Sequence, residues 1–234
     1  MKKYDIVYFY KYTKTQELKY SLRSVEKNMP HNEVWIYGDM PDGIKPDHMI
    51  EVLQSGFTVW QRTTNMLKDI CLNPDISENF WLFNDDFFIL KPMTSEKPVY
   101  AGTLEERVAE IEQRHKSKSA YSRQLERVIA ALKKDGFKTR NYATHTPLLV
   151  NKEKALETIE RYPTIPMFRA LYGNMHDIKG RNIKRDVKLI GAHDIPKEDQ
   201  QFVSTNDTSF NKECGKYIRR MFAKPSRFEV KADG

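Results

Sequence analysis

The sequence is poor in cysteine, lacks glycine-rich nucleotide loops and contains no long hydrophobic run. Among its 234 residues, the two cysteines Cys71 and Cys214 are too few for a disulfide framework and have no metal-ligand neighbour at zinc-finger spacing. No apolar stretch approaches the roughly 20 residues that span a bilayer. Gly-x-Gly-x-x-Gly, Gly-x-x-x-x-Gly-Lys-Ser/Thr and Gly-x-Ser-x-Gly are absent, which argues against dinucleotide enzymes, P-loop NTPases and nucleophile-elbow enzymes. The first residues show no cleavable signal pattern, so we expect a cytoplasmic protein without a membrane span.

The composition is that of a folded, basic protein. Hydrophobic residues make up 39% of the chain and aromatic residues 12%, which argues against disorder. Lys and Arg number 39 against 32 Asp and Glu, a difference of +7, and basic clusters lie at 179–188 and 212–227. This charge favours contact with a polyanion, although many solvated protein surfaces are basic.

The first ninety residues alternate between β-type runs and helical periodicity. Strands are predicted at 5–10, 34–37, 50–53 and 80–83, and helices at 15–29, with Thr15 as its N-cap, and at 59–72. A series of strands and helices in alternation predicts an α/β fold with a mostly parallel sheet and helices on both faces, of the Rossmann-like kind.

The middle of the chain differs in character. Residues 104–136 are helix formers with few β-branched residues, and they predict a helix pair inserted into a single domain that spans 1–234. Further elements are expected after it: a strand at 148–150, a helix at 152–161, a strand at 187–190, and a run at 202–207 before a closing helix to about 220.

The strongest local signal is an acidic pair, Asp85 and Asp86, at the end of an apolar strand. Two adjacent carboxylates in apolar surroundings need a cation or hydrogen-bond donors. In an open α/β sheet, ligands gather beyond the carboxyl ends of the strands. The pair is therefore a candidate site for Mg²⁺ or Mn²⁺ against a diphosphate, with one Asp free to act as a base. The alternative is a tight turn whose acids cap backbone amides.

Four other positions are candidates for binding or catalysis. His145 precedes Pro147, which fixes the backbone and can present the imidazole at a cleft rim. Arg169 has apolar neighbours, and a fixed guanidinium suits bidentate phosphate recognition. His193 and Asp207 each follow a predicted strand and are candidate metal ligands. For each of them a structural role is the alternative: a loop histidine, a surface ion pair or a helix cap.

The ordered set of motifs resembles the Stealth proteins. Residues 17–27, 35–39 and 83–88 together resemble the second conserved block of that family. His145-Thr146-Pro147 and the following 152–163 look like its third block, and Asn206-Asp207 corresponds to the fourth. The resemblance covers most of the chain outside 104–136.

Stealth enzymes transfer a sugar 1-phosphate from a nucleotide sugar, and their core is similar to GT-A glycosyltransferases. The resemblance implies a GT-A-like fold and a metal-assisted nucleotide-sugar site. It suggests Asp85 and Asp86 at the metal and the reacting hydroxyl, His145 and Arg169 near the donor phosphates, and Asp39 near the nucleoside. With the other candidates included, we expect catalysis by Asp85, Asp86 and His145 and metal binding by Asp86, His193 and Asp207. We expect donor binding by a set of four residues: Tyr10, Asp39, Arg62 and Arg169.

The chain departs from the family's first block at 6–12, and in its compact size it resembles small GT-A-like glycosyltransferases of bacteria and their phages. The leading hypothesis is therefore a metal-assisted glycosyltransferase that moves a sugar from a nucleotide sugar to an acceptor hydroxyl. One alternative is Stealth-type transfer of sugar 1-phosphate, and another is a non-catalytic nucleic-acid-binding protein. A polyanionic acceptor, DNA or a wall polymer, would combine the two classes. The sequence does not identify the acceptor or the oligomeric state.

Overall fold

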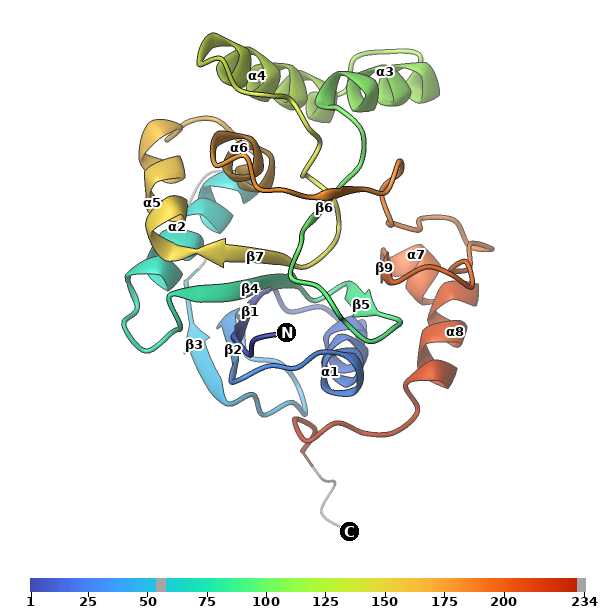
Figure 1. Cartoon of the computed structure of the whole chain (residues 1–234). Coiled ribbons are helices and arrows are strands. Elements are labelled where there is room, and N and C mark those ends of the chain that lie inside the picture. The colour runs from blue at the N-terminus through green and yellow to red at the C-terminus, as the bar shows by residue number, and fades with distance from the viewer. Residues whose placement is uncertain (54–57, 231–234) are drawn as a thin grey trace.

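The central sheet is built from β1 (Asp5–Tyr10), β2 (Val34–Gly38), β3 (His48–Glu51), β4 (Asn79–Asn84) and β7 (Leu148–Asn151). In the computed structural model, which describes residues 1–53 and 58–230, these strands lie in the order β3-β2-β1-β4-β7 (Figure 1). The first four are parallel, and β7 runs antiparallel to β4 at the edge. The predicted mostly parallel sheet is thereby confirmed.

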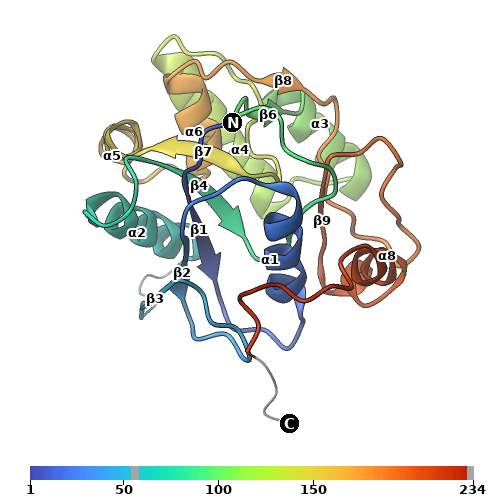
Figure 2. The ribbon, with the colours of Figure 1, turned by 60° about the horizontal axis from the view of Figure 1, so that its bottom comes forward.

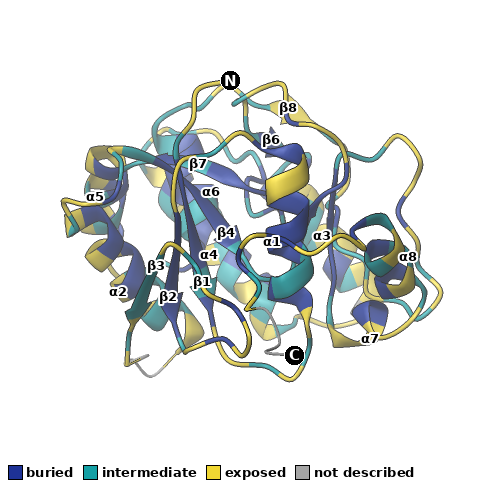
Figure 3. Ribbon diagram, turned by 90° about the horizontal axis from the view of Figure 1, so that it is seen from below, coloured by how far each residue is buried: buried dark blue, intermediate teal, exposed yellow. Residues whose placement is uncertain are grey.

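Helices cover both faces of this sheet, as predicted. The helix α1 (Glu17–Asn28) lies on one face, and α2 (Val59–Leu72) and α5 (Lys152–Arg161) lie on the other, as Figure 2 shows. Side chains alternate along each strand, so Ile6 and Tyr8 pack toward α1 while Val7 packs toward α2. The three central strands, β1, β2 and β4, are buried on both faces (Figure 3), which explains why their sequences are almost continuously apolar.

The remaining elements surround one edge of the sheet. The predicted helix pair is present as α3 (Leu104–His115) and α4 (Ala120–Lys134), and it shares a hydrophobic core with α6 (Phe168–Met175). Four short strands form two two-stranded ribbons: β5 (Phe87–Ile89) pairs with β9 (Phe202–Ser204), and β6 (Val99–Tyr100) pairs with β8 (Arg181–Asn182). The last two helices of the chain are α7 (Asp207–Phe210) and α8 (Glu213–Met221). Within the described ranges, no helix combines the length and apolarity that crossing a bilayer requires.

Three predicted details are wrong. The strand expected at 187–190 is an extended segment that meets β9 through a single bridge, Lys188 with Ser204. The third strand of the sheet begins at His48, two residues before the prediction, because its pairing with Trp35 sets the register. Thr15 does not cap α1: the N-cap is Gln16, and the Thr15 hydroxyl donates to the Glu17 carboxylate at 2.9 Å.

Gly38 lets β1 and β2 approach closely at their carboxyl ends. Its φ of 137° lies in the region that favours glycine, and a Cβ there would stand 1.8 Å from the Tyr10 carbonyl oxygen. The next residue, Asp39, donates its N–H to the same carbonyl at 3.2 Å. The glycine therefore places Asp39 next to the carboxyl end of β1.

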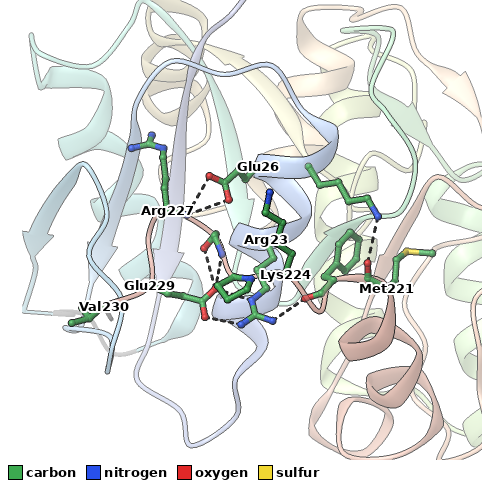
Figure 4. Close-up of a pocket in the computed structure, with 11 residues that line it drawn as sticks. Arg23, Glu26, Met221, Lys224, Arg227, Glu229 and Val230 are labelled. Carbon is green, nitrogen blue, oxygen red and sulfur yellow. Dashed lines mark hydrogen bonds and ion pairs between the residues drawn. The ribbon is translucent and has the colours of Figure 1, made fainter. Parts of the chain in front are cut away.

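The C-terminal segment returns across α1 and is held by a buried arginine. Arg23 donates from Nε and Nη2 to the two carboxylate oxygens of Glu229, both at 2.7 Å, and from Nη1 to the Phe222 carbonyl at 2.8 Å (Figure 4). Arg227 forms a second bidentate pair with Asp47. Burial is the largest single effect and would raise the pKa of Glu229, but the hydrogen bonds from Arg23 and the Ser226 N–H, with the charges of Arg23 and Lys19, together lower the pKa to about 2.

This pair predicts an acid-sensitive attachment of the C-terminal segment. A carboxyl whose pKa is lower in the folded protein stabilises it fully above the unfolded-state pKa, near 4.5, and loses that contribution as the pH falls toward 2. We expect Glu229→Gln to lower the free energy of unfolding by about 2 kcal/mol at pH 7 and by clearly less at pH 3. Urea unfolding at both pH values measures this. Glu198→Gln, at an exposed glutamate, is the control, and an equal loss for Glu229→Gln at both pH values would contradict the prediction.

Candidate functional site

Most of the predicted site residues lie at the end of the sheet where the parallel strands have their carboxyl ends. The acidic pair follows β4 directly. Because β7 is antiparallel and Leu148 pairs with Leu82, the residues before β7, His145 among them, reach the same edge. Arg169, in the first turn of α6, donates to the carbonyls of Leu82 and Thr146 and so is fixed there too. The antiparallel edge strand thus joins two motifs that are sixty residues apart in the chain.

Asp86 lies in a polar pocket formed by the C-terminal third of the chain. Its Oδ2 accepts from the Lys188 ammonium at 2.8 Å and from the Ser204 hydroxyl at 2.6 Å. Its carbonyl accepts from the Thr205 N–H at 3.3 Å. The bonds to Oδ2 compensate the charge of Asp86 with one cation and one hydroxyl, so the acidic pair is more than a turn that caps backbone amides.

Asp85 faces a different environment, on the α1 side of β4. Burial, and then repulsion from Asp86 and Glu17, raise the pKa of Asp85 to about 8. The Glu17 carboxylate is itself buried, which raises its pKa, and it accepts hydrogen bonds from Thr15 and Thr205. With a pKa of about 8, Asp85 releases and takes up its proton close to neutral pH, so it is a candidate acid–base group at the end of a central strand.

His145 is held by Asp186, a residue that the sequence analysis did not select. The imidazole Nδ1 of His145 lies 2.6 Å from Asp186 Oδ2, and the backbone N–H of His145 donates to Asp186 Oδ1 at 3.0 Å. The imidazole meets the edge of the Phe87 ring. Two bonds to one carboxylate fix both the backbone and the ring of His145.

Arg169 is a cation held by neutral groups. Its Nη1 donates to the Thr146 carbonyl at 2.6 Å, its Nη2 donates to the Leu82 carbonyl at 3.2 Å, and its guanidinium lies 5.2 Å from the centre of the Phe87 ring. Burial lowers its pKa to about 10, against the opposing effect of Asp86 and Asp186. Arg169 is therefore still charged at neutral pH. It forms no ion pair with a carboxylate in 1–53 or 58–230.

A cavity of about 250 Å³ opens beside these groups. One wall comes from the first turns of α2, and another comes from the start of α6 and from α4. The lining combines aromatic and aliphatic side chains with a smaller number of polar ones, and it includes Trp60, Phe168, Tyr121, Asn84, His145 and Arg169. A pocket with apolar walls and a few convergent polar groups is the usual form of a small-molecule site. Tyr121 also makes the helix pair part of the cavity wall.

The other predicted donor-binding residues lie outside this cavity. Tyr10 borders a second cavity, of about 530 Å³, on the α1 side of the sheet. Asp39 Oδ2 accepts from the Tyr12 N–H at 2.8 Å near that cavity. Arg62 lies in the first turn of α2, but its neighbours Trp60 and Thr63, rather than Arg62, line the 250 Å³ cavity. The structure thus brings Arg169 to His145 and Asp86, and it places Tyr10 on the α1 side of the sheet, where burial, and then the charge of Asp85, raise its pKa.

The predicted metal ligands do not meet in this arrangement. No group of three His, Cys, Asp or Glu side chains in the described part of the chain is positioned to hold a metal ion. His193 lies near Glu213 of α8, whose pKa it helps to lower, and Asp207 lies in the first turn of α7, near Glu17. Lys188 already occupies Asp86 Oδ2. The carboxylates have the oxygen donors that Mg²⁺ prefers, but their arrangement does not fit a metal site.

The three residues that the sequence analysis missed are Glu17, Asp186 and Lys188. Glu17 begins a helix, where acidic residues are common for reasons of helix stability alone. Asp186 and Lys188 are separated by one residue in an extended segment, which places both on one side while Val187 is buried on the other. That alternation was visible in the sequence, although no signal there indicated which partners the two charges would meet.

Comparisons with known proteins give a likeness in fold only. No family model and no curated protein matches the chain. Among solved structures, the galactosyltransferase LgtC with donor and acceptor sugar analogues is 12% identical over 95% of this chain and 96% of that chain, with a TM-score of 0.49. An active-site mutant of LgtC gives 13% and 0.48, over the same shares of the two chains. The glycosyltransferase GlyE of Streptococcus pneumoniae TIGR4 gives 11% and 0.38, over 94% of this chain and 50% of that one. At this identity and at TM-scores below 0.5, these structures assign no activity to the chain.

The pair of Lys188 with Asp86 can be tested by a double-mutant cycle. We expect Lys188→Met and Asp86→Asn each to destabilise the protein, and the double variant to be more stable than the sum of the two losses predicts, by about 1 kcal/mol. The reason is that removal of Lys188 leaves Asp86 next to two other carboxyls without a cation. Urea unfolding in the presence of a chelator measures the coupling, with Lys184→Met as the control at an exposed lysine. Additive losses would show that the two side chains do not interact.

Proposed function

We propose that the chain is a transferase that uses a nucleotide-sugar donor and moves the sugar to an acceptor hydroxyl. The observation that carries this proposal is the convergence, at one edge of the sheet, of a carboxyl that titrates near neutral pH with a fixed guanidinium and a lysine. Asp85 is the proton acceptor, while Arg169 and Lys188 supply the positive charge that a departing diphosphate requires.

The reaction follows from these roles. The acceptor hydroxyl attacks the anomeric carbon and gives its proton to Asp85. The bond between that carbon and the phosphate oxygen breaks, and the nucleoside diphosphate leaves with the electron pair. Arg169 suits the phosphate because its planar fork is held by two carbonyls and needs no further ordering. The aromatic cavity beside it takes part of the donor or of the acceptor.

One observation favours a second candidate, the transfer of sugar 1-phosphate. A histidine whose Nδ1 is bound by a carboxylate lies at the same cavity as Arg169, and this pair of groups suits attack at phosphorus. In that case the nucleophile forms a bond to the phosphorus that carries the sugar, and the bond between this phosphorus and the bridging oxygen breaks, so that the oxygen leaves with the nucleoside. A nucleoside monophosphate then leaves in place of the diphosphate.

Dependence on Mn²⁺ or Mg²⁺, the cytoplasmic location and a polyanionic acceptor stay predictions. The helix pair is a poor candidate for polyanion binding, because several of its cations are used in ion pairs: Arg107 with Glu110, Lys118 with Glu126 and Lys133 with Glu105. Within the basic cluster at 179–188, Lys179 binds Asp177 and Lys188 binds Asp86. These pairs reduce the charge available to nucleic acid, so the non-catalytic alternative is not favoured.

A panel of nucleotide sugars, each with Mn²⁺ or with a chelator, tests the proposal. A ligand at a hundred times its Kd stabilises the native state by about 2.7 kcal/mol, which for a chain of this length raises Tm by roughly 5–10 °C. We expect one class of nucleotide sugar to give such a shift and to be turned over. Release of a nucleoside diphosphate indicates glycosyl transfer, and release of a monophosphate indicates sugar-phosphate transfer.

Variants connect that turnover to the site. We expect Asp85→Asn to reduce turnover at least about 100-fold because it removes the proton acceptor, while Asp75→Asn, at an exposed aspartate, leaves it unchanged. Stabilisation by no nucleotide sugar, together with salt-dependent binding of an oligonucleotide, would overturn the proposal in favour of a nucleic-acid-binding protein.

A further inference from the structure

Asp186 uses both carboxylate oxygens on groups that define the position of His145. Oδ2 binds the imidazole Nδ1 of His145 at 2.6 Å. Oδ1 accepts from the backbone N–H groups of His145 and Val187, at 3.0 and 2.8 Å. The side chain of Asp186 is only 12% exposed, against 31% for His145. A short bond between partners that are shielded from water fixes the direction of the ring much better than an exposed ion pair would.

The charge of Asp186 determines which nitrogen of His145 carries the proton. Burial is the largest single effect and opposes ionisation of Asp186, but the hydrogen bonds and charge of His145, together with the charge of Arg107 of α3, outweigh it, so the pKa of Asp186 lies below its usual value. An ionised carboxylate only accepts hydrogen bonds. The neutral imidazole must therefore carry its proton on Nδ1, which leaves the lone pair on Nε2.

The second nitrogen is available to a substrate. His145 lines the 250 Å³ cavity together with Arg169 and Phe87. In the described part of the chain, the imidazole makes its hydrogen bond through Nδ1, to Asp186. No protein group there is bonded to Nε2. The charged groups near this histidine are Asp186, Arg107 and Arg169, and they come from three different parts of the chain.

We propose that Asp186 is the positioning residue of His145: it fixes the Nδ1–H tautomer and thereby presents the lone pair of Nε2 to the cavity. This role rests on the proposed function, since the lone pair of Nε2 accepts a hydrogen bond from a hydroxyl of the substrate in glycosyl transfer and acts as a nucleophile toward phosphorus in sugar-phosphate transfer. Both reactions need the same tautomer. Asp186 itself touches no substrate.

The variant Asp186→Asn tests this assignment while it keeps the local fold. The asparagine Oδ1 can still accept from the backbone N–H groups of His145 and Val187. Its NH₂ group, however, stands where Oδ2 of Asp186 accepted from the imidazole, and NH₂ can only donate there. We expect the imidazole to change to the Nε2–H tautomer, as ¹⁵N NMR of the His145 ring nitrogens reports directly. The wild-type protein should show an Nδ1 proton shifted downfield by its short hydrogen bond. Asp199→Asn, an exposed aspartate in the following loop, is the matched control and leaves the tautomer unchanged.

The two proposals fail in different ways. The NMR measurement requires no substrate, so a wild-type His145 found as the Nε2–H tautomer, or a tautomer unchanged in Asp186→Asn, overturns the positioning role whatever the activity. For the nucleotide sugar that the panel identifies, we expect Asp186→Asn to lower kcat by about 10²- to 10⁴-fold with little change in KM. An unchanged kcat would likewise overturn it. A confirmed tautomer change without turnover of any nucleotide sugar would overturn the proposed function alone.

Discussion

Concentrated negative charge at the end of β4 is the constraint on which the arrangement of the site depends. Asp85 and Asp86 lie beside Glu17 of α1, and three carboxyls this close cannot all be ionised without compensation. The ammonium and hydroxyl groups bonded to Asp86 belong to Lys188 and Ser204, which lie 102 and 118 residues further along the chain. The N-terminal strands and helices therefore form the charged site, but the C-terminal third makes it stable.

The C-terminal third also connects the two motifs of the candidate site, the acidic pair and His145. Residues 186–188 are extended, and their first and last side chains reach His145 and Asp86. A single stretch of three residues thus fixes the imidazole with a negative charge and one carboxylate with a positive charge. Opposite charges placed one residue apart keep the local net charge near zero, which suits a partly buried site.

The helix pair contributes to the site although it lies outside the central sheet. It packs on α6, whose first turn carries Arg169, and its Tyr121 lines the cavity. Arg107 of the same pair comes close enough to Asp186 to affect its ionisation. Because several of its cations form ion pairs on its own surface, the pair is better explained as a wall of the site and a support for α6 than as a contact for a polyanion.

Periodicity and residue type were sufficient to predict the local structure. The helices at 59–72 and 152–161 have the predicted bounds, and the acidic pair, His145 and Arg169 were chosen from their neighbours in the chain. These features depend on contacts within a few residues, so they are encoded locally. Glu17, Asp186 and Lys188 could not be chosen in this way, because their significance depends on side chains as much as 188 residues distant. The sequence by itself determined the α/β architecture and where acidic, basic and imidazole groups occur. The tertiary structure decided which of those charges face each other, because the antiparallel edge strand and the returning C-terminal segment set the distances that govern hydrogen bonding and ionisation.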